Sequence, residues 1–531
     1  MSFTNMRRLV IAGMAGDSGK SIVSMALLRA LRAVPASTSA NATTALERDA
    51  GVEVRAFKKG PDYIDAAWLS FVSGAPARNL DSWLMGFPGV VESFAAHATR
   101  TGFNLVEGNR GLFDGSDAAG THSTAELAKA LAAPVLLVVN VTKMTRTAAA
   151  LVMGCQHLDP GLRIAGVVLN FVASKRHEKV VREAIEQACG IPVVGAIPKL
   201  RSEALPQRHL GLVTPEDHPA VAQLPAALDE VAAHLDLARI KEIAADVPAL
   251  PAPAATPAMV ERAERGSAAS PQQAQIERLP GGPVRIAVLR DAAFSFYYED
   301  NLEALRQAGA ELVCVSALDD PALPRNVDAV YIGGGFPEVH AARLEANASF
   351  RQSLAQAAGR GLPVYAECGG LMLLSRAICW DGKRHAMAGV LPFEVEVGSA
   401  PQGHGYVEMT VDAANPFYPL GTILRGHEFH YSRVSVLASG ALPPQQAQAP
   451  RLPGAPAAGD ASALKTACLV RRGTGTVSGS WGKRDGVLVK NVWASYTHLH
   501  ARATPEWAAA VVGLARQYRA RNSAGLVELA G

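Results

Sequence analysis

The chain has 531 residues, of which 49% are hydrophobic and 19% charged, and its formal net charge is +3 at pH 7. This composition excludes a disordered or fibrous chain, and the length indicates two large domains, because a single core stops growing well below this size. With nearly balanced charge and no clustered basic stripe, the chain is not expected to bind nucleic acid.

The sequence carries no pattern typical of secretion, membrane insertion or disulfide bonding. The apolar stretch near the start runs directly into a glycine-rich loop, so it predicts a first strand and not a signal peptide. The longest apolar run, residues 133–141, has about half of the ~20 residues that a membrane-spanning helix needs. The cysteines form no CxxC pair and are widely spaced: Cys155, Cys189, Cys314, Cys368, Cys379 and Cys468. We therefore expect reduced thiols in a cytoplasmic protein without a membrane partner.

The first half of the chain alternates short β-branched runs with longer segments of helical character. The predicted strands are residues 9–13, 52–57, 103–108, 134–140, 164–170 and 191–198. This alternation is typical of a parallel sheet with helices on both faces, so residues 1–246 are predicted to form a doubly wound α/β domain. Residues 247–283 are rich in Ala, Pro, Gln and Ser and are predicted to be a linker.

The same alternation restarts after the linker. Strands are predicted at residues 284–290, 311–317, 328–335 and 362–370, with a helix near residues 301–308. Residues 284–520 are therefore predicted to form a second α/β domain. A second Ala/Pro-rich stretch, around residues 440–463, is expected to be a surface loop inserted into it.

A glycine-rich loop, GMAGDSGKS, follows the first strand and precedes an apolar helical run. Backbone amides of such a loop can cradle phosphates, Lys20 can reach the terminal ones, and Ser21 can hold magnesium. The spacing is one residue longer than in the standard motif, because Met14 stands where the first glycine would be. A glycine turn with a chance Gly-Lys-Ser is the alternative, but the strand, loop and helix context favours ATP binding. The loop glycines are Gly13, Gly16 and Gly19.

Charged residues follow two of the later strands. Glu107 lies at the end of the strand 103–108, where an acidic residue commonly supports a metal ion on the phosphates, although helix capping is equally consistent. Asp114 follows on the same loop. A second strand-end loop contains Lys58, Lys59, Asp62, Tyr63 and Asp65. This loop is a candidate substrate site, and the alternative is a charged turn that is merely exposed to solvent.

A candidate nucleophile follows a strand of the second domain. Cys368 precedes Gly369 and Gly370 in a strand-to-helix turn, where backbone amides can lower the pKa of its thiol and hold an oxyanion. A run of three glycines, residues 333–335, follows another strand and could face this turn as a second source of amides. Either His498 or His500 is expected to act as the base. A lone buried cysteine is usually only a small hydrophobe, but the glycines and the turn favour catalysis.

Eight segments in this order closely resemble the cobyrinate a,c-diamide synthase family: GMAGDSGKS, KKGPDYID, RNLDSW, VEGNRGLFDG, LPQRHLGL, GGGFPE, AECGGLM and SYTHLH. The resemblance implies a dethiobiotin-synthetase-like ATP domain followed by a class I glutamine amidotransferase domain. It further implies that ATP activates the a and c carboxylates of a corrin-type macrocycle, and that ammonia from glutamine converts them to amides. A homodimer is suggested at the family level only.

The resemblance also assigns roles to individual residues. It implies that Lys20 and Ser21 serve ATP and Mg²⁺, that Glu107 supports the metal, and that Asn170 reads the adenine. It implies that Asp62, Asp65 and Asp114 serve the macrocycle or its phosphorylated intermediate, and that Cys368 is the glutaminase nucleophile with His498 as its base. From their places in the loops, Lys59 and Tyr63 are added as candidate substrate residues and Gly335 and Gly369 as candidate oxyanion donors.

Two departures from related patterns leave questions open. Class I glutaminases usually complete their triad with His-x-Glu, whereas this chain reads His498-Leu499-His500, so nothing in the sequence says what orients His498. Asn109 and Arg110 replace the residues typical of corrin-specific members, which keeps a siroheme or sirohydrochlorin amidase as an alternative. A regulatory P-loop ATPase is disfavoured, because Ala15 stands where its signature lysine would be. A binding module with an inactive cysteine site is disfavoured by the intact Gly334, Cys368 and His498.

Overall fold

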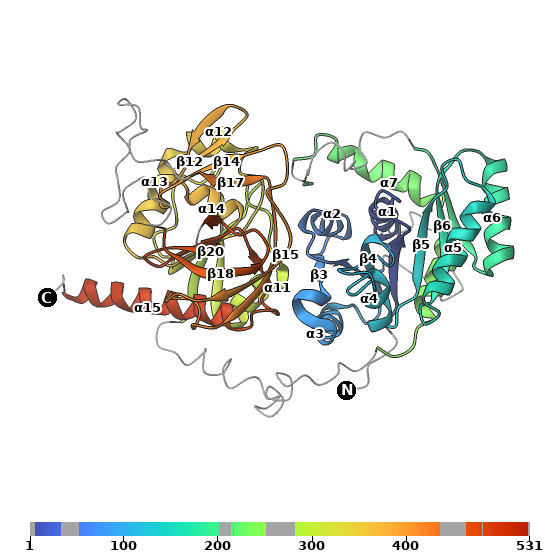
Figure 1. Cartoon of the computed structure of the whole chain (residues 1–531), viewed down its shortest axis with the longest axis horizontal. Helices are drawn as coiled ribbons and strands as arrows, with labels where there is room; N and C mark the ends of the chain where they lie inside the picture. Colours follow the sequence, from blue (N-terminus) through green and yellow to red (C-terminus); the bar gives the residue numbers. More distant parts are fainter. Residues whose placement is uncertain are drawn as a thin grey trace, which may run out of the picture. The chain divides into compact units, whose positions relative to one another are not determined.

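The computed structural model describes residues 6–32, 52–200, 214–215, 217–250, 282–435, 464–479 and 482–528. The chain divides into two compact units, Met1–Glu261 and Arg262–Gly531, which we describe separately (Figure 1). Most of the expected linker, the Ala/Pro-rich insert at 440–463 and the LPQRHLGL segment at 205–212 lie outside the described residues. The domain boundaries taken from the sequence therefore stay predictions. No helix in the described part of the chain is long and apolar enough to cross a membrane.

Unit 1 is built on a seven-stranded sheet in which every neighbouring pair of strands is parallel. Across the sheet the order is β3 (Arg78–Leu80), β2 (Val54–Lys59), β4 (Phe103–Gly111), β1 (Arg8–Gly13), β5 (Val135–Asn140), β6 (Ile164–Val172) and β7 (Val193–Pro198). The six strands predicted from the sequence are present, and the short strand β3 is an addition to them.

Helices cover both faces of this sheet, which confirms the doubly wound fold. One face carries α1 (Lys20–Arg32), α2 (Tyr63–Ser73), α7 (Leu224–Ala232) and α8 (Leu237–Ala245). The other carries α3 (Ser82–His97), α4 (Thr124–Ala130), α5 (Arg146–Leu158) and α6 (Lys175–Cys189). Successive residues of β1 alternate between the two cores, with Leu9 and Ile11 in one and Val10 and Ala12 in the other. Because both faces of such a strand are buried, most of its side chains are apolar, and it reads as a nearly continuous apolar run.

Unit 2 contains an eleven-stranded mixed sheet. Its parallel part runs in the order β21 (Val492–Ser495), β11 (Val364–Glu367), β10 (Ala329–Ile332), β8 (Val284–Leu289) and β9 (Ala310–Val315). Antiparallel strands extend it beyond β21 through β20 (Gly482–Val489), β18 (Thr466–Arg472), β15 (Gly403–Val411), β16 (Ile423–His430) and β22 (His498–Leu499), with β19 (Val477–Gly479) paired to β20. The sequence predicted the parallel strands but not this antiparallel extension.

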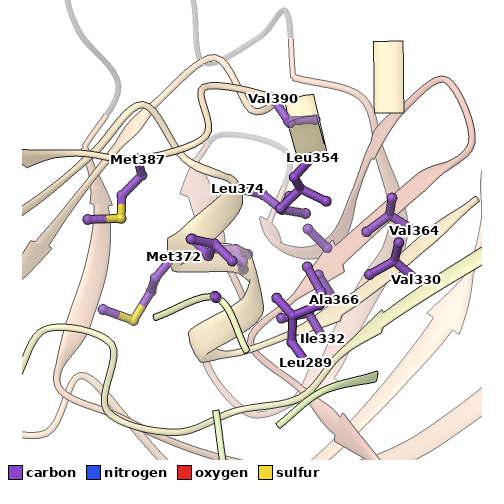
Figure 2. Close-up of a cluster of buried hydrophobic side chains, with 14 of the residues drawn as sticks. Leu289, Val330, Ile332, Leu354, Val364, Ala366, Met372, Leu374, Met387 and Val390 are labelled. Atoms are coloured by element: carbon purple, nitrogen blue, oxygen red, sulfur yellow. The ribbon is translucent and has the colours of Figure 1, made fainter. Parts of the chain in front are cut away.

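The core on one face of this sheet is completed by helices and by a second, smaller sheet (Figure 2). Leu289, Ile332 and Ala366 project from the strands toward Leu354 of α13 (Ala348–Gly359) and Leu374 of α14 (Gly369–Leu374). The smaller sheet has the order β13 (Lys383–Ala386), β12 (Ala377–Trp380), β14 (Glu394–Val397) and β17 (Ser432–Ser435), and the short helix α12 (Ala341–Ala346) joins this side. The opposite face is covered by α11 (Glu299–Gln307) and α15 (Glu506–Glu528).

A fully buried arginine fastens the sheet of unit 1 to its last described segment. The guanidinium of Arg8 donates to the carbonyl oxygens of Leu131 at 2.6 Å, Pro248 at 2.9 Å and Ala132 at 3.1 Å. Burial lowers the pKa of Arg8 to about 10. The bond to Pro248 joins residues 240 positions apart in sequence, so Arg8 helps to hold the chain after α8 against the sheet, together with the buried side chain of Leu250 and the contact of Arg163 with Asp246.

We expect the substitution Arg8→Met to weaken unit 1 by about 2–4 kcal/mol, because it leaves several buried carbonyl groups without donors. Native-state hydrogen exchange of the amides of β1 and β5 measures this loss. The matched control is Arg55→Met, which removes an exposed ion pair with Glu53 and should change stability by less than about 1 kcal/mol. Equal protection in the two variants would contradict the role given to Arg8.

Candidate active sites

The glycine-rich loop of unit 1 connects β1 to the start of α1, as the sequence predicts. Lys20, the first residue of α1, folds back so that its Nζ donates to the carbonyl of Ala15 at 2.9 Å. Gly19 has a φ of +94°, and a Cβ at this position would lie 2.1 Å from the side-chain nitrogen of Asn170. Asn170 uses this nitrogen to donate to the carbonyl of Ser18 at 3.0 Å. The amide of Asn170 therefore supports the loop, a contact that the sequence did not predict.

Lys58 of β2, Glu107 of β4 and Asp65 of α2 form a buried charged cluster, which Ser21 of α1 contacts. The carboxylate oxygen Oε1 of Glu107 accepts hydrogen bonds from Ser21 Oγ and from Lys58 Nζ, both at 2.8 Å. Lys58 also pairs with Asp65 at 2.6 Å, and the side chains of Lys58 and Glu107 are both 0% exposed. Glu107 lies within a strand, so the helix-capping interpretation of this residue is wrong.

The charges of this cluster depend on one another. Burial opposes the ammonium of Lys58, but the carboxylates of Asp65 and Glu107 outweigh it and raise the pKa of Lys58 above its ordinary value. Burial raises the pKa of Glu107, while Lys58 and the Ser21 hydroxyl act in the opposite direction. Lys58 thus stays charged and compensates two acids that would be costly to bury alone.

The donors around Glu107 fit a magnesium ion. The second oxygen of Glu107 is buried and has no hydrogen-bond partner among the described residues, while the Ser21 hydroxyl lies beside the first. Carboxylate and hydroxyl oxygens are donors that Mg²⁺ prefers, and this ion commonly completes its shell with phosphate and water. Within the described ranges no group of three or more His, Cys, Asp or Glu side chains could hold a metal.

The predicted substrate residues divide between this cluster and the neighbouring turns. Asp62 caps α2, since its side chain accepts from the amide of Asp65 at 2.9 Å. Asp114 accepts from the amide of Gly111 at 2.8 Å. Lys59 is 7% exposed, and burial lowers the pKa of its ammonium, which the carboxylates of Asp81 and Asp114 partly offset. Tyr63 is also buried. The turns thus place acids and a lysine with a lowered pKa at the same edge of the sheet.

Unit 2 presents Cys368 on a strained turn between β11 and α14. The backbone at Cys368 has φ +49° and ψ −100°, a region that costs a non-glycine residue of the order of 1–3 kcal/mol. Its amide donates to the carbonyl of Ser495 at 2.7 Å, and the amide of Gly370 donates to the carbonyl of Gly333 at 3.1 Å. The cysteine turn and the triple-glycine loop therefore contact each other directly.

Gly334 lets the nucleophile and a histidine approach each other. A Cβ on Gly334 would lie 2.4 Å from Cε1 and 3.2 Å from Nε2 of His498, and 3.5 Å from Cβ of Cys368. The amide nitrogen of Gly335 lies 3.1 Å from the position that a Cβ on Gly369 would take, so the triple-glycine loop packs closely against the cysteine turn. His500 packs instead on the ring of Tyr298 and accepts from a backbone amide. Of the two histidines, the structure brings His498 to Cys368.

A backbone amide lowers the pKa of the Cys368 thiol as expected, but the net shift is upward. Burial raises the pKa of this thiol well above its ordinary value, and the carboxylate of Glu338 adds to the shift. The amide of Gly369 does donate to the sulfur and lowers the pKa, but by less. Glu338 is itself unusual, since burial raises its pKa to about 7. The thiol is therefore protonated at rest, so catalysis requires a base.

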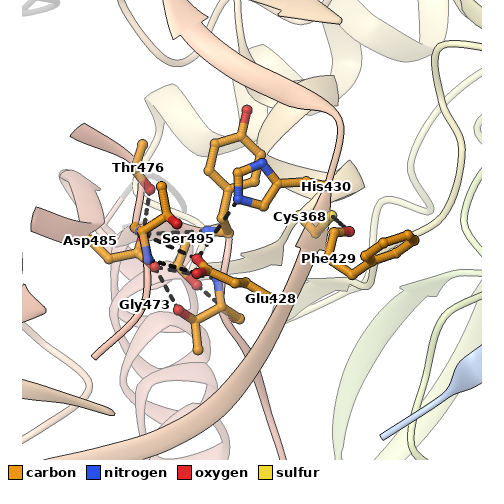
Figure 3. Close-up of polar contacts among 12 residues, drawn as sticks. Cys368, Glu428, Phe429, His430, Gly473, Thr476, Asp485 and Ser495 are labelled. Carbon is orange, nitrogen blue, oxygen red and sulfur yellow. Dashed lines mark hydrogen bonds and ion pairs between the residues drawn. The ribbon is translucent and has the colours of Figure 1, made fainter. Parts of the chain in front are cut away.

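Polar residues that the sequence analysis missed hold the segment that carries His498 (Figure 3). Asp485 is fully buried and accepts hydrogen bonds from the hydroxyls of Thr476 and Thr497 and from the amide of Gly486. Nearby, Glu428 accepts from two backbone amides of the segment 473–475 and lies 3.8 Å from His430. Neither acid stands in a recognisable motif, because its partners are distant in sequence.

A further buried acid, Glu367, immediately precedes the nucleophile. Its Oε2 lies 3.7 Å from Nδ1 of His498. The sequence analysis quoted this residue within AECGGLM but gave it no role. A glutamate at the end of an otherwise apolar strand, directly before the nucleophile, was the signal that could have identified it.

Comparisons with known proteins agree with the folds of both units. Residues 7–204 match the AAA domain family, and residues 285–506 match the CobB/CobQ-like glutamine amidotransferase domain family. A cobyrinate a,c-diamide synthase of Magnetococcus marinus is 41% identical over 518 residues, covering 97% of this chain and 98% of its own.

Further relatives that carry the same name cover both chains as completely. The protein of Syntrophotalea carbinolica is 40% identical, with 96% of this chain and 98% of its own covered. That of Methanosarcina acetivorans is 35% identical, with 97% and 96% covered. Since the identity extends over nearly the whole of both chains, this chain belongs to the cobyrinate a,c-diamide synthase family.

Proposed function

We propose that this chain catalyses the ATP-dependent amidation of the a- and c-side-chain carboxylates of cobyrinate, with ammonia taken from glutamine, in cobalamin biosynthesis. The observation that carries the proposal is the 41% identity, over 97% of the chain, to a relative named for this activity. Two separate sites in the same chain support it, one of phosphate-binding type and one of cysteine and histidine. A cytoplasmic location and a homodimer stay predictions.

In unit 1 the chemical task is to make a carboxylate reactive. Transfer of the γ-phosphoryl group to a carboxylate oxygen creates an acyl phosphate, from which ammonia displaces phosphate to leave the amide. Lys20 would release the Ala15 carbonyl and neutralise the phosphates as they bind. Ser21 and Glu107 would hold Mg²⁺, which when bound offsets the negative charge of the phosphates. Lys58 can then turn toward Asp65, its second partner at 2.6 Å.

Binding of the macrocycle is assigned to residues at and after the ends of β2 and β4. Lys59 and Tyr63 offer a donor each to its acidic side chains, and Asp62, Asp65 and Asp114 fix the turns or orient the donors. Adenine recognition by Asn170 would require this side chain to give up its hydrogen bond to Ser18. Arg110, exposed and with φ +52°, can meet a further substrate carboxylate.

In unit 2 the chemical task is to release ammonia. The Sγ–H proton of Cys368 passes to Nε2 of His498, and the thiolate attacks the side-chain amide carbon of glutamine. The backbone N–H groups of Gly335 and Gly369 donate hydrogen bonds to the substrate oxygen and stabilise the negative charge that forms on it. Return of the proton to the departing nitrogen releases ammonia and leaves a thioester, which water hydrolyses to glutamate.

Mass spectrometry of the products tests the substrate. The protein is incubated with ATP, Mg²⁺ and glutamine, and in separate reactions with cobyrinate, hydrogenobyrinate, sirohydrochlorin and siroheme. We expect two carboxylates of cobyrinate to be converted to amides. Amidation of sirohydrochlorin or siroheme alone would overturn the assigned substrate, and the absence of any amidation would overturn the reaction itself.

The division of labour between the two units predicts the behaviour of Cys368→Ala. Glutamine-driven synthesis should fall at least about 100-fold, since the covalent intermediate cannot form, whereas synthesis driven by ammonium chloride should remain. The control is Cys379→Ala, a half-buried thiol in the smaller sheet of the same unit, which should retain both activities. Equal loss from both nitrogen sources in Cys368→Ala would contradict the assignment.

The charge of Glu338 should restrain the thiol of Cys368. The pKa of Glu338 is about 7, so its carboxylate disfavours the thiolate above this pH and is neutral below it. We expect Glu338→Gln to speed alkylation of Cys368 by iodoacetamide roughly 3- to 10-fold above pH 8 and to leave the rate below pH 6 unchanged.

Peptide mass spectrometry reports alkylation of Cys368 separately from that of the other cysteines. The control variant, Glu311→Gln, removes an exposed acid of β9 and should follow the wild-type pH dependence. If Glu338→Gln reacts at the wild-type rate throughout, the charge of Glu338 does not act on this thiol.

A further inference from the structure

The sequence position that usually supplies the carboxylate for a catalytic histidine of this type holds no acid in this chain. The position two residues after His498 holds His500, whose ring packs on Tyr298 at a centroid distance of 4.8 Å. A neutral histidine needs a partner on Nδ1 to keep Nε2 free to accept a proton. The question is therefore which group stands on the Nδ1 side of His498.

Glu367 occupies that side. Its Oε2 lies 3.7 Å from Nδ1 of His498, and the two side chains are 1% and 2% exposed. The parallel pairing of β11 with β21 sets Glu367 opposite Ser495, three residues before His498. At 3.7 Å the contact is longer than a hydrogen bond, but the two side chains face each other where water does not reach them, so electrostatic interaction between them is only weakly screened.

The carboxylate is also held in place by other donors. Its Oε1 accepts from the amide of Leu499 at 3.0 Å, and its Oε2 accepts from the hydroxyl of Tyr331 at 3.1 Å. Asn301 braces the same region, since its side chain donates to the carbonyl of Leu499 at 2.8 Å. Because both oxygens are fixed, the carboxylate cannot swing away from the ring when the ring becomes charged.

We infer that Glu367 is the positioning acid of this glutaminase. It lies directly before the nucleophile in sequence, whereas class I glutaminases usually use a glutamate two residues after the histidine for this role. The inference rests on the proposed glutaminase function. As Cys368 Sγ–H breaks and Nε2–H forms, the imidazolium keeps its Nδ1 proton and directs it toward the carboxylate of Glu367. Glu367 thus stabilises the charge that appears on His498 only during the reaction.

Other titratable groups surround this pair and must be separated from it. The tyrosines near Glu367 are Tyr297, Tyr331, Tyr365 and Tyr418, and burial raises the pKa of each. On the histidine side lie His404 and His427, and burial together with His498 lowers the pKa of His427 to about 3. Glu338 and Glu428 lie toward Cys368. With its pKa of about 7, Glu338 titrates in the working range, so its contribution has to be controlled.

The test is Glu367→Gln in the full chain, which keeps the shape and the acceptor for Leu499 but removes the charge. Glutamine-driven synthesis should fall roughly 100-fold or more in kcat, while ammonia-driven synthesis stays within about twofold of wild type. The acid limb of the pH profile of glutamine hydrolysis should move to lower pH, because the imidazolium loses its negative partner. The shift is measured both in the natural background and in Glu338→Gln.

Two further variants separate positioning from simple structural support. Glu367→Asp keeps the charge and should restore the position of the acid limb even if kcat stays reduced. Glu394→Gln neutralises another buried glutamate, in β14, and should leave glutamine hydrolysis within about twofold of wild type. The inference is overturned if Glu367→Gln keeps wild-type kcat, or if Glu367→Gln and Glu367→Asp are equally impaired with unmoved limbs. A wild-type chain that hydrolyses no glutamine would instead overturn the proposed function.

Discussion

The hydrogen-bond register between parallel strands sets the distances between the reactive groups in both units. In unit 1, β2 and β4 pair Lys58 with Glu107, and β4 pairs the same glutamate with Ile11 of β1, two residues before the phosphate loop. In unit 2, β11 and β21 pair Glu367 with Ser495. Since the carboxyl ends of parallel strands lie at one edge of a sheet, strand pairing alone brings residues from remote parts of the sequence together there. A slip of one residue would turn each side chain to the opposite face.

In both sites burial affects the charge of the reactive groups, but the results are opposite. In unit 1 the buried ammonium of Lys58 lies between the carboxylates of Asp65 and Glu107, and it counters the rise in the pKa of Glu107 that burial causes. In unit 2 burial keeps the thiol of Cys368 protonated until a base acts on it. The first site is therefore prepared to receive a highly charged ligand, whereas the second is inert until glutamine, histidine and thiol are together.

How far the sequence could predict this structure depends on the span of each interaction. Lys20 and Ser21 were predictable because the loop and its helix are consecutive, and Cys368 was predictable from the glycines that follow it. The contact of Glu367 with His498 joins residues 131 positions apart in sequence, and its geometry follows from a strand pairing that no local pattern encodes. The antiparallel extension of unit 2 was missed for a similar reason, because its strands expose one face to polar surroundings and read less clearly than buried parallel strands.

The left-handed backbone at Cys368 has a consequence for how this enzyme can change over evolutionary time. Glycine adopts such a conformation without steric cost, so replacing the cysteine by glycine would relieve strain at the same moment that it abolishes the nucleophile. Selection for stability and selection for catalysis therefore oppose each other at this position. A lineage that acquired another source of ammonia would gain stability by losing the cysteine, and its glutaminase half could persist as a folded remnant.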